Sequence, residues 1–283
     1  MVHYHRPAFI PEVVDLLRPK PHKIIIYATL GNCGHSLVLL KLQATVHALD
    51  LDSNNISLAL NRLKQLNLSA NFHPHHLNFA NLSDLFPPHF AHGLLLDLGL
   101  SWNQIKTSGL GFSFSDRRQL DMRLDPSTQS VAAFDIINHF TYHQLFTIFS
   151  TLAQEKYSSS LAKLIVKSRP ISSSFQLANL IAKFYPHYSR LHPATKIFLA
   201  LRIAVNQEFL NLKKALDASL IVLKTNSPVV IISYHSGEDR IVKRFIAQHH
   251  LVHCRAILST SNYPPHRSAI LRSYQTHHEP ISA

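Results

Sequence analysis

The sequence has few cysteines and no long apolar segment. Cys33 and Cys254 are the only cysteines among 283 residues. One possible disulfide would constrain little of a chain this long, and no Cys-x-x-Cys pair is present, so we expect a reducing, cytoplasmic location. No apolar run approaches the roughly 20 residues of a membrane-spanning helix. Residues 1–12 also lack the apolar core of a secretory signal, so we expect no membrane partner.

Acidic residues are scarce compared with basic ones. The chain has 16 aspartates and glutamates against 28 lysines and arginines, a formal net charge of +12, and 21 histidines besides. Its hydrophobic content of 46% is enough for a sizeable core and too high for a disordered chain. A basic surface favours polyanions, nucleic acid first among them, whereas a basic face that meets only solvent is the alternative.

A complete Gly-x-Gly-x-x-Gly fingerprint is also missing, which argues against a nucleotide-dependent oxidoreductase. What remains is a turn containing Gly31 and Gly34, between an apolar strand over residues 23–29 and a helix over residues 36–42. Such a turn lets backbone N–H groups approach a ligand, and the start of the helix favours its negative group. A tight turn without a ligand is the structural alternative.

Strand and helix patterns alternate on both sides of a purely helical middle. Apolar runs, β-branched in the first of them, predict strands over residues 23–29, 45–50, 93–97 and 229–233, with helices over 53–66 (capped by Ser53) and 238–248. The middle has helical periodicity over residues 131–138, 142–153, 159–167 and 175–184, and one long helix is expected over 195–223. The sequence therefore predicts an α/β, Rossmann-like sheet domain (residues 1–106 and 197–283) with an all-helical insertion (residues 107–196).

Two aspartates end predicted strands. Asp50 ends the second strand and could accept hydrogen bonds from both hydroxyls of a ribose, while the nearby Asp52 has helix capping as its simpler role. Asp97 ends the third strand, where a purely structural role as a loop acceptor is the alternative. Because ligands of open α/β sheets bind beyond the carboxyl ends of the strands, both carboxylates are expected at one crevice that holds a nucleoside-containing cofactor.

Eight motifs in the same order resemble those of the ribosomal RNA small-subunit (16S) cytidine N4-methyltransferase family, over about residues 5–245. They are His5-Arg-Pro-Ala-Phe-Ile-Pro-Glu12, Ala28-Thr-Leu-Gly-Asn-Cys-Gly-His-Ser36, Leu96-Asp-Leu-Gly-Leu-Ser101, Gly111-Phe-Ser-Phe114, Leu120-Asp-Met-Arg-Leu-Asp125, His192-Pro-Ala-Thr195, Ala200-Leu-Arg-Ile-Ala-Val-Asn206 and Ile232-Ser-Tyr-His-Ser-Gly-Glu-Asp-Arg240. The resemblance implies a Rossmann-like methyltransferase fold with an inserted helical domain that recognises RNA. It further implies that the cofactor is S-adenosylmethionine and that the partner is ribosomal RNA or the small ribosomal subunit.

The resemblance also implies where the cofactor binds. Its methionine end would lie at Cys33, Gly34 and His35, its ribose at Asp50, its adenosine at Phe79, and Asp97 and Gln104 would complete the site. For catalysis, Asp97 is the expected acceptor for the cytidine amine, with His235 as the second candidate. No metal is expected, because the sulfonium of the cofactor is already an activated leaving group.

Residues within or near the shared motifs are the candidates for RNA contacts: His5, Arg123, Arg202, Asn206 and Ser236. Arg202 and Asn206 lie four positions apart on one helix face, so they could instead tie that helix to the sheet domain. The segment from Ser236 to Asp239 also has the pattern of a helix-capping box. The oligomeric state is open.

The chain departs from the family at several of these motifs. Tyr27 stands where the family usually has aspartate, and Cys33 where it has glycine. Leu110 replaces an arginine of the family, Trp102 a second serine, and Gly237 a leucine. A catalytically weakened RNA-binding homologue is therefore the alternative function. The histidines of His73-Pro-His-His76 are typical of a metal site, but Pro74 and the general excess of histidine favour a solvated loop.

Overall fold

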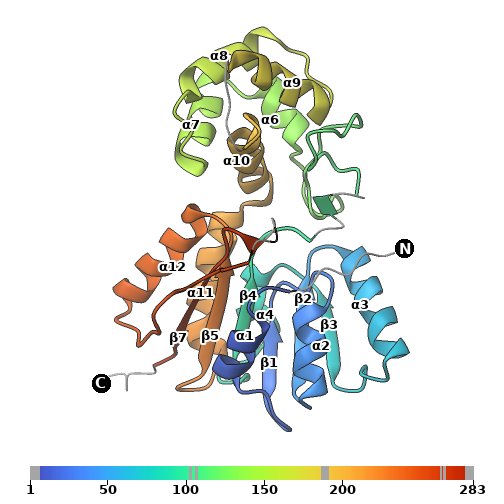
Figure 1. The fold of residues 1–283 in the computed structure, drawn as a ribbon, viewed down its shortest axis with the longest axis vertical. Helices are drawn as coiled ribbons and strands as arrows, with labels where there is room; N and C mark the ends of the chain where they lie inside the picture. Colours follow the sequence, from blue (N-terminus) through green and yellow to red (C-terminus); the bar gives the residue numbers. More distant parts are fainter. Residues whose placement is uncertain are drawn as a thin grey trace. The chain divides into compact units, whose positions relative to one another are not determined.

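The computed structural model describes residues 7–101, 104–105, 108–185, 191–261, 263 and 266–277. The chain divides into two compact units (Figure 1). We call the part formed by Met1–Gly99 and Phe209–Ala283 the sheet unit, and Leu100–Glu208 the helical unit. No helix in the described part of the chain is long and apolar enough to cross a membrane.

The sheet unit is built on a seven-stranded sheet with the order β3-β2-β1-β4-β5-β7-β6. The strands are β1 (Ile24–Tyr27), β2 (Thr45–Asp50), β3 (Phe72–His76), β4 (Leu94–Asp97), β5 (Pro228–Ser233), β6 (Ile257–Leu258) and β7 (Ile270–Gln275). Strands β1 to β5 run parallel, whereas β7 pairs antiparallel with both β5 and β6. The parallel strands therefore bring Tyr27, Asp50, Asp97 and Ser233 to one edge of the sheet, as the Rossmann-like prediction requires.

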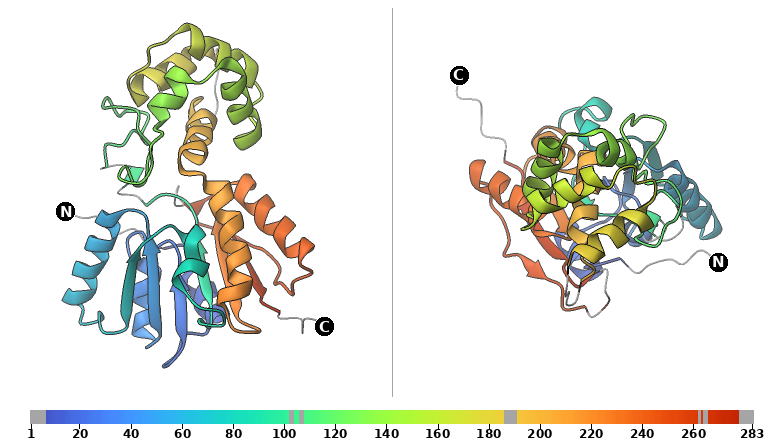
Figure 2. Two further views of the ribbon diagram at one scale, coloured as in Figure 1. Left: turned by 180° about the vertical axis from the view of Figure 1, so that it is seen from behind. Right: turned by 90° about the horizontal axis from the view of Figure 1, so that it is seen from above.

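Helices cover both faces of this sheet (Figure 2). One layer holds α1 (Ile10–Leu17), α2 (Gly34–Lys41) and α3 (Ser53–Gln65), and the other holds α4 (Leu82–Leu85), α11 (Glu208–Val222) and α12 (Ser236–Gln248). Along β1 the side chains alternate, so that Ile25 packs in the first layer and Ile26 in the second. This double burial explains why the strands are continuous apolar runs rather than alternating ones.

The helical unit has its own hydrophobic core. It contains α6 (Ala133–His139), α7 (Tyr142–Leu152), α8 (Ser158–Lys167), α9 (Ser174–Phe184) and α10 (Thr195–Asn206). Leu145, Ile165, Leu177 and Leu201 belong to one buried cluster that joins these helices. The helical periodicity of the middle of the chain is thus confirmed.

The single long helix expected over residues 195–223 is wrong. Gln207 has a φ of 50° in the left-handed region and ends α10, and α11 begins at Glu208. Because α10 packs in the core of the helical unit, the unit boundaries fall at Gly99 and Glu208, not at residues 106 and 196. A second correction concerns α3, whose N-cap is Asp52 rather than Ser53, with the Asp52 carboxylate accepting from Asn54 N at 3.0 Å.

The expected solvated loop over His73–His76 is also wrong, because these residues form the edge strand β3. Pro74 is tolerated there because β3 pairs only with β2, so one side of its backbone needs no partner in the sheet. The strands β6 and β7 and helix α1 were not predicted either. Their patterns are short or mixed, and pairing and burial decide their conformation rather than local periodicity.

Pairing of β2 with β3 brings three histidines together. His47 Nδ1 lies 3.1 Å from His75 Nε2, the His47 and His73 rings stack at 4.6 Å, and the rings of Phe86 and Phe90 lie nearly perpendicular to that of His47. One nitrogen of the His47–His75 pair must donate and the other accept, so the pair requires an unprotonated acceptor. Burial, followed by the neighbouring histidines, lowers the pKa of His47 from 6.5 to about 4.

This cluster predicts a loss of stability in mild acid. An unfolded His47 takes up its proton near pH 6.5 and the folded one near pH 4, so stability present above pH 6.5 is lost as the pH falls through that interval. Between about pH 7.5 and 5, the free energy of unfolding should fall about 1 kcal/mol further in the wild type than in His47→Leu, after discounting for the half-exposed ring. Urea unfolding at both pH values measures the difference, and parallel losses in the two proteins would contradict it.

Candidate active site

The Asp50 carboxylate holds the glycine turn against the end of β2. Its Oδ2 accepts from Gly31 N at 2.8 Å and from Asn55 Nδ2 at 3.1 Å, and its Oδ1 accepts from Asp52 N at 2.9 Å. A carboxylate offers about four acceptor positions, so these donors leave about one, on Oδ1. Asp50 therefore keeps about one acceptor position for a ligand, and its contact with the hydroxyls of a ribose stays a prediction. Burial raises the pKa of Asp50 to about 6, against the opposing effect of these hydrogen bonds.

Cys33 ends the turn with its side chain in the core. Its φ of 65° is left-handed, which costs an L-residue roughly 1–2 kcal/mol. The side chain is 0% exposed and packs with the apolar residues beneath α1, α2 and α3, and burial raises the pKa of the thiol to about 11. The cysteine that replaces the family's glycine is thus a neutral core residue. The N–H groups of the first turn of α2, which begins at Gly34, are oriented to bind an anion.

The segment before α1 packs directly on this turn. A Cβ at Gly34 would lie 2.7 Å from Pro7 Cγ, so only glycine fits beneath the proline. The next residue, His35, is buried, and its Nε2 lies 2.9 Å from the carbonyl oxygen of Ala8. The N-terminal motif, through Pro7 and Ala8, therefore packs on and hydrogen-bonds to the turn motif, through Gly34 and His35.

The second aspartate, Asp97, is held from three sides at the end of β4. Tyr234 donates its hydroxyl to Asp97 Oδ1 at 2.9 Å, His35 Nδ1 lies 3.4 Å from Oδ2, and the Asp97 backbone N donates to Thr29 Oγ1 at 2.8 Å. Burial raises the pKa of Asp97, while the charge of His35 and the Tyr234 hydrogen bond act in the opposite direction. Asp97 and Asp50 thus lie at the same edge of the sheet, at the ends of β4 and β2, the two strands that flank β1.

The other two expected cofactor residues lie in different units. Phe79 begins a short 3-10 helix (Phe79–Asn81) just after β3 in the sheet unit, where it is half-buried against the core. Gln104 belongs to the helical unit, where its Oε1 accepts from Ser101 N at 2.8 Å. Their contacts with a cofactor stay predictions.

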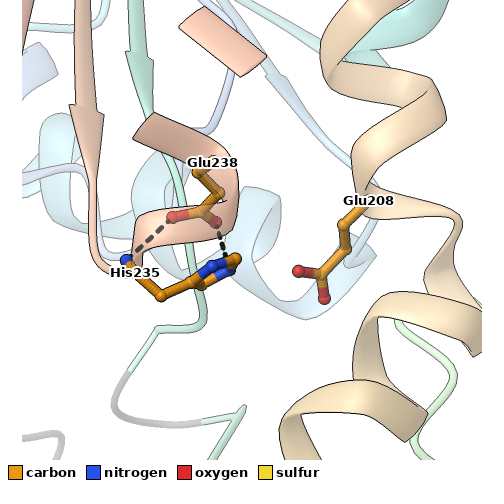
Figure 3. A group of neighbouring side chains, drawn as sticks. All are labelled: Glu208, His235 and Glu238. Atoms are coloured by element: carbon orange, nitrogen blue, oxygen red, sulfur yellow. Dashed lines mark hydrogen bonds and ion pairs between the residues drawn. The ribbon is translucent and has the colours of Figure 1, made fainter. Parts of the chain in front are cut away.

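His235 and Glu238 interact at the start of α12 (Figure 3). Glu238 is buried, its Oε1 lies 3.2 Å from His235 Nε2, and its Oε2 accepts from the backbone N of Tyr234 at 2.8 Å. Glu238 Oε2 also accepts from His235 N at 3.3 Å, so a capping box is present one residue earlier than expected, with His235 and Glu238 in place of Ser236 and Asp239. Tyr234 joins the two expected catalytic residues, because its hydroxyl binds Asp97 and its backbone binds the glutamate that holds His235.

Gly237, where the family has leucine, fits the ring of Phe209. A Cβ at Gly237 would lie 2.5 Å from Phe209 Cζ. The phenylalanine of α11 therefore fills the space that a larger residue on α12 would need. The ring of Phe209 thus compensates for the missing leucine side chain, and both residues belong to the sheet unit.

The expected RNA contacts are mostly engaged inside the helical unit. Arg123 forms a two-pronged ion pair with Asp121, at 2.7 and 2.8 Å, and Arg202 forms one with Glu208, at 2.8 and 2.9 Å. Asn206 is buried and ties α10 to the segment before α6, donating to Met122 O at 2.9 Å and accepting from Leu124 N at 3.0 Å.

The geometry of Asn206 thus favours a structural tie over an RNA contact. The tie lies within the helical unit, not with the sheet domain as the sequence suggested. Ser236 is exposed at the start of α12, and His5 lies outside the described residues.

Sequence reasoning missed Thr29, Tyr234 and Ala8 as parts of the site. All three lie inside the shared motifs, in which other residues were chosen. Their roles depend on a hydroxyl or a backbone carbonyl. Only the three-dimensional contacts reveal such roles.

Comparison with known proteins extends over most of the chain. The model of the MraW methylase family matches residues 2–273. The chain is 37% identical over 249 residues to the ribosomal RNA small subunit methyltransferase H of Deinococcus radiodurans, covering 86% of this chain and 78% of that protein. The protein of the same name from Mesoplasma florum is 34% identical over 265 residues, covering 92% and 86%. A solved putative rRNA methylase from Clostridium thermocellum is 11% identical, covers 99% of this chain and 100% of its own, and superposes with a TM-score of 0.49.

Proposed function

Because the chain belongs to the MraW methylase family and is therefore a methyltransferase, we propose that it methylates the N4 amine of a cytidine in small-subunit ribosomal RNA, with S-adenosylmethionine as the donor. Two relatives that match most of this chain, at 37% and 34% identity, carry the name ribosomal RNA small subunit methyltransferase H. The observation that carries the proposal is the arrangement of Asp50 and Asp97 at one sheet edge beside the turn of α2.

The described residues fit S-adenosylmethionine. The first turn of α2 is suited to its methionine carboxylate, and the remaining acceptor position on Asp50 Oδ1 to one ribose hydroxyl. The buried thiol of Cys33 is directed into the core, so the departure from the family's glycine does not remove the anion-binding geometry of the turn. When bound, the cofactor supplies a methyl group on a positively charged sulfur.

Asp97 acts on the amine that receives the methyl group. The nitrogen lone pair of cytidine N4 is delocalised into the ring, and a base inside folded RNA is stacked or paired, so the base must be extruded and its pairing edge held. An acceptor placed at the amine orients it and favours the positive charge that develops on nitrogen. Asp97 keeps acceptor positions for this role, because Tyr234 and His35 each engage one position on a different oxygen. His235 is the second candidate for contact with the base edge.

The helical unit is the proposed RNA-recognition domain. Two of its exposed cations lie over aromatic rings, the Arg117 guanidinium 4.2 Å from the centre of the Phe175 ring and Lys163 Nζ 5.8 Å from that of Tyr142. Such pairs combine phosphate attraction with a stacking surface for unpaired bases. The partner is ribosomal RNA, free or in the small subunit, and the site of action is the cytoplasm.

Methyl transfer to small ribosomal subunits tests this function. Subunits from cells that lack the modification are incubated with the protein and tritium-labelled S-adenosylmethionine, and the digested RNA is analysed by mass spectrometry. We expect label in N4-methylcytidine at a single position of the small-subunit RNA. Binding of S-adenosylmethionine by calorimetry without transfer to subunits or to free RNA would favour the weakened RNA-binding homologue instead.

A further inference from the structure

A partly buried group of hydrogen-bonding side chains surrounds Asp97, and one of its protons can be assigned. The Ala8 carbonyl only accepts hydrogen bonds, so His35 Nε2 must donate to it across 2.9 Å. His35 Nδ1 then carries a proton only when the ring is charged, and it faces Asp97 Oδ2 at 3.4 Å. Two unprotonated acceptors at that distance would repel, so the contact is stabilised when one of the two groups, the imidazole or the carboxyl, carries a proton.

Tyr234 is placed to engage the other oxygen of Asp97. Its ring lies close to the backbone of Gly99, where an added Cβ would be 3.3 Å from Tyr234 Cδ2 and where φ is +105°, a conformation that favours glycine. Its backbone is fixed as well, because its N donates to Glu238 Oε2 at 2.8 Å and its carbonyl accepts from Ser268 Oγ at 2.8 Å. The hydroxyl therefore points at Asp97 Oδ1 from a fixed position, 2.9 Å away.

We propose that Tyr234 is a positioning residue for methyl transfer, whose hydroxyl, together with His35, holds the Asp97 carboxylate ionised and oriented toward the substrate amine. This inference rests on the proposed function of Asp97. The two oxygens of the carboxylate are each held by one donor from a different element, so the group cannot rotate without losing both. The remaining acceptor positions then have a fixed direction before the substrate arrives, which lowers the cost of orientation.

The charged and titratable groups that face Asp97 act on it in opposite directions. His35 from α2 and the Tyr234 hydroxyl favour its ionised form, and Glu238 from α12 disfavours it. Tyr27 from β1 lies 3.3 Å from His35 Nδ1, and burial raises the pKa of its phenol well above the ordinary range, as it does that of Tyr234. Both tyrosines are therefore neutral at physiological pH, and Tyr234 keeps the proton that it donates.

Replacing Tyr234 by phenylalanine removes this donor and leaves the ring in place. In Tyr234→Phe we expect turnover near pH 7 to fall about five- to ten-fold. The acidic limb of the pH profile of kcat should move to higher pH, so turnover should recover as the pH rises. The KM for S-adenosylmethionine should stay within about two-fold of wild type, because the hydroxyl touches the carboxylate and not the ribose side of the site. Carbon-13 NMR of labelled aspartate provides a readout independent of activity, and the titration midpoint of Asp97 should rise.

Tyr274→Phe is the matched control, because Tyr274 is a buried tyrosine whose hydroxyl also has a side-chain partner, Ser219 Oγ at 2.7 Å, away from Asp97. It should leave both the pH profile and the Asp97 titration unchanged. An unchanged acidic limb and carboxyl titration in Tyr234→Phe, with methyl transfer intact, would overturn the positioning role. If the wild type transferred no methyl group, the proposed function would fail, while the NMR titration would still decide whether Tyr234 holds Asp97 ionised.

Discussion

Asp50→Ala should weaken binding of S-adenosylmethionine about ten-fold or more. The substitution removes the acceptor for a ribose hydroxyl, and a hydrogen bond to a charged group contributes roughly 1.5–3 kcal/mol. It also leaves Gly31 N and Asn55 Nδ2 without their acceptor, so the turn that faces the methionine end loses its attachment to β2. Calorimetric titration with the cofactor measures the loss, at a temperature where circular dichroism shows the variant folded.

The neighbouring carboxylate provides the control for charge. Asp52→Ala removes the same charge two residues away, but its side chain caps α3. This variant should lose roughly 1 kcal/mol of stability and keep its cofactor affinity. Since the pKa of Asp50 is about 6, wild-type affinity should also decline as the pH falls through 6, where the carboxyl loses its charge. Equal affinities for Asp50→Ala and the wild type would remove Asp50 from the cofactor site.

The parallel strands of the sheet unit could be predicted because both of their faces are buried. The runs that form β1, β4 and β5 are almost wholly apolar up to a polar last residue, and β2 is mostly apolar before Asp50, so both the strands and their functional ends were visible in the sequence. The edge strand β3 could not be found in this way. Its Phe72-His-Pro-His-His76 sequence has no strand propensity, and its conformation depends on pairing with β2 and on the ring contacts of His47.

The candidate site was predictable in its charges but not in its hydrogen bonds. Asp50 and Asp97 follow from their positions at strand ends. No local pattern shows that Asp50 also holds the turn, or that the hydroxyl of Tyr234 reaches back to β4 across 137 positions in the chain. The break after Asn206 was equally hidden, because a left-handed glutamine interrupts an otherwise continuous helical pattern. These features depend on contacts between segments far apart in sequence.

Asp97→Asn should reduce turnover by about 100-fold or more while changing cofactor affinity much less. Asparagine preserves the shape of the site, because its carbonyl can accept from Tyr234 and its amide N–H can donate to a neutral His35 across the same 3.4 Å contact. The substituted side chain thus reproduces the two hydrogen bonds and removes only the negative charge. Loss of a charge directed at a developing positive centre typically costs a factor of 10² to 10³ in rate, about 2.7–4 kcal/mol.

Single-turnover transfer to small subunits, measured beside calorimetric cofactor binding, separates the two effects. His235→Ala is the comparison variant and should lower turnover less, because His235 interacts with Glu238 rather than with the carboxylate at the end of β4. The result also locates the buried proton. Asparagine would be a faithful substitute for a protonated Asp97 that donates to His35, so full turnover in Asp97→Asn would show that the proton resides on the aspartate. A large loss would place the proton on His35 and the working charge on Asp97.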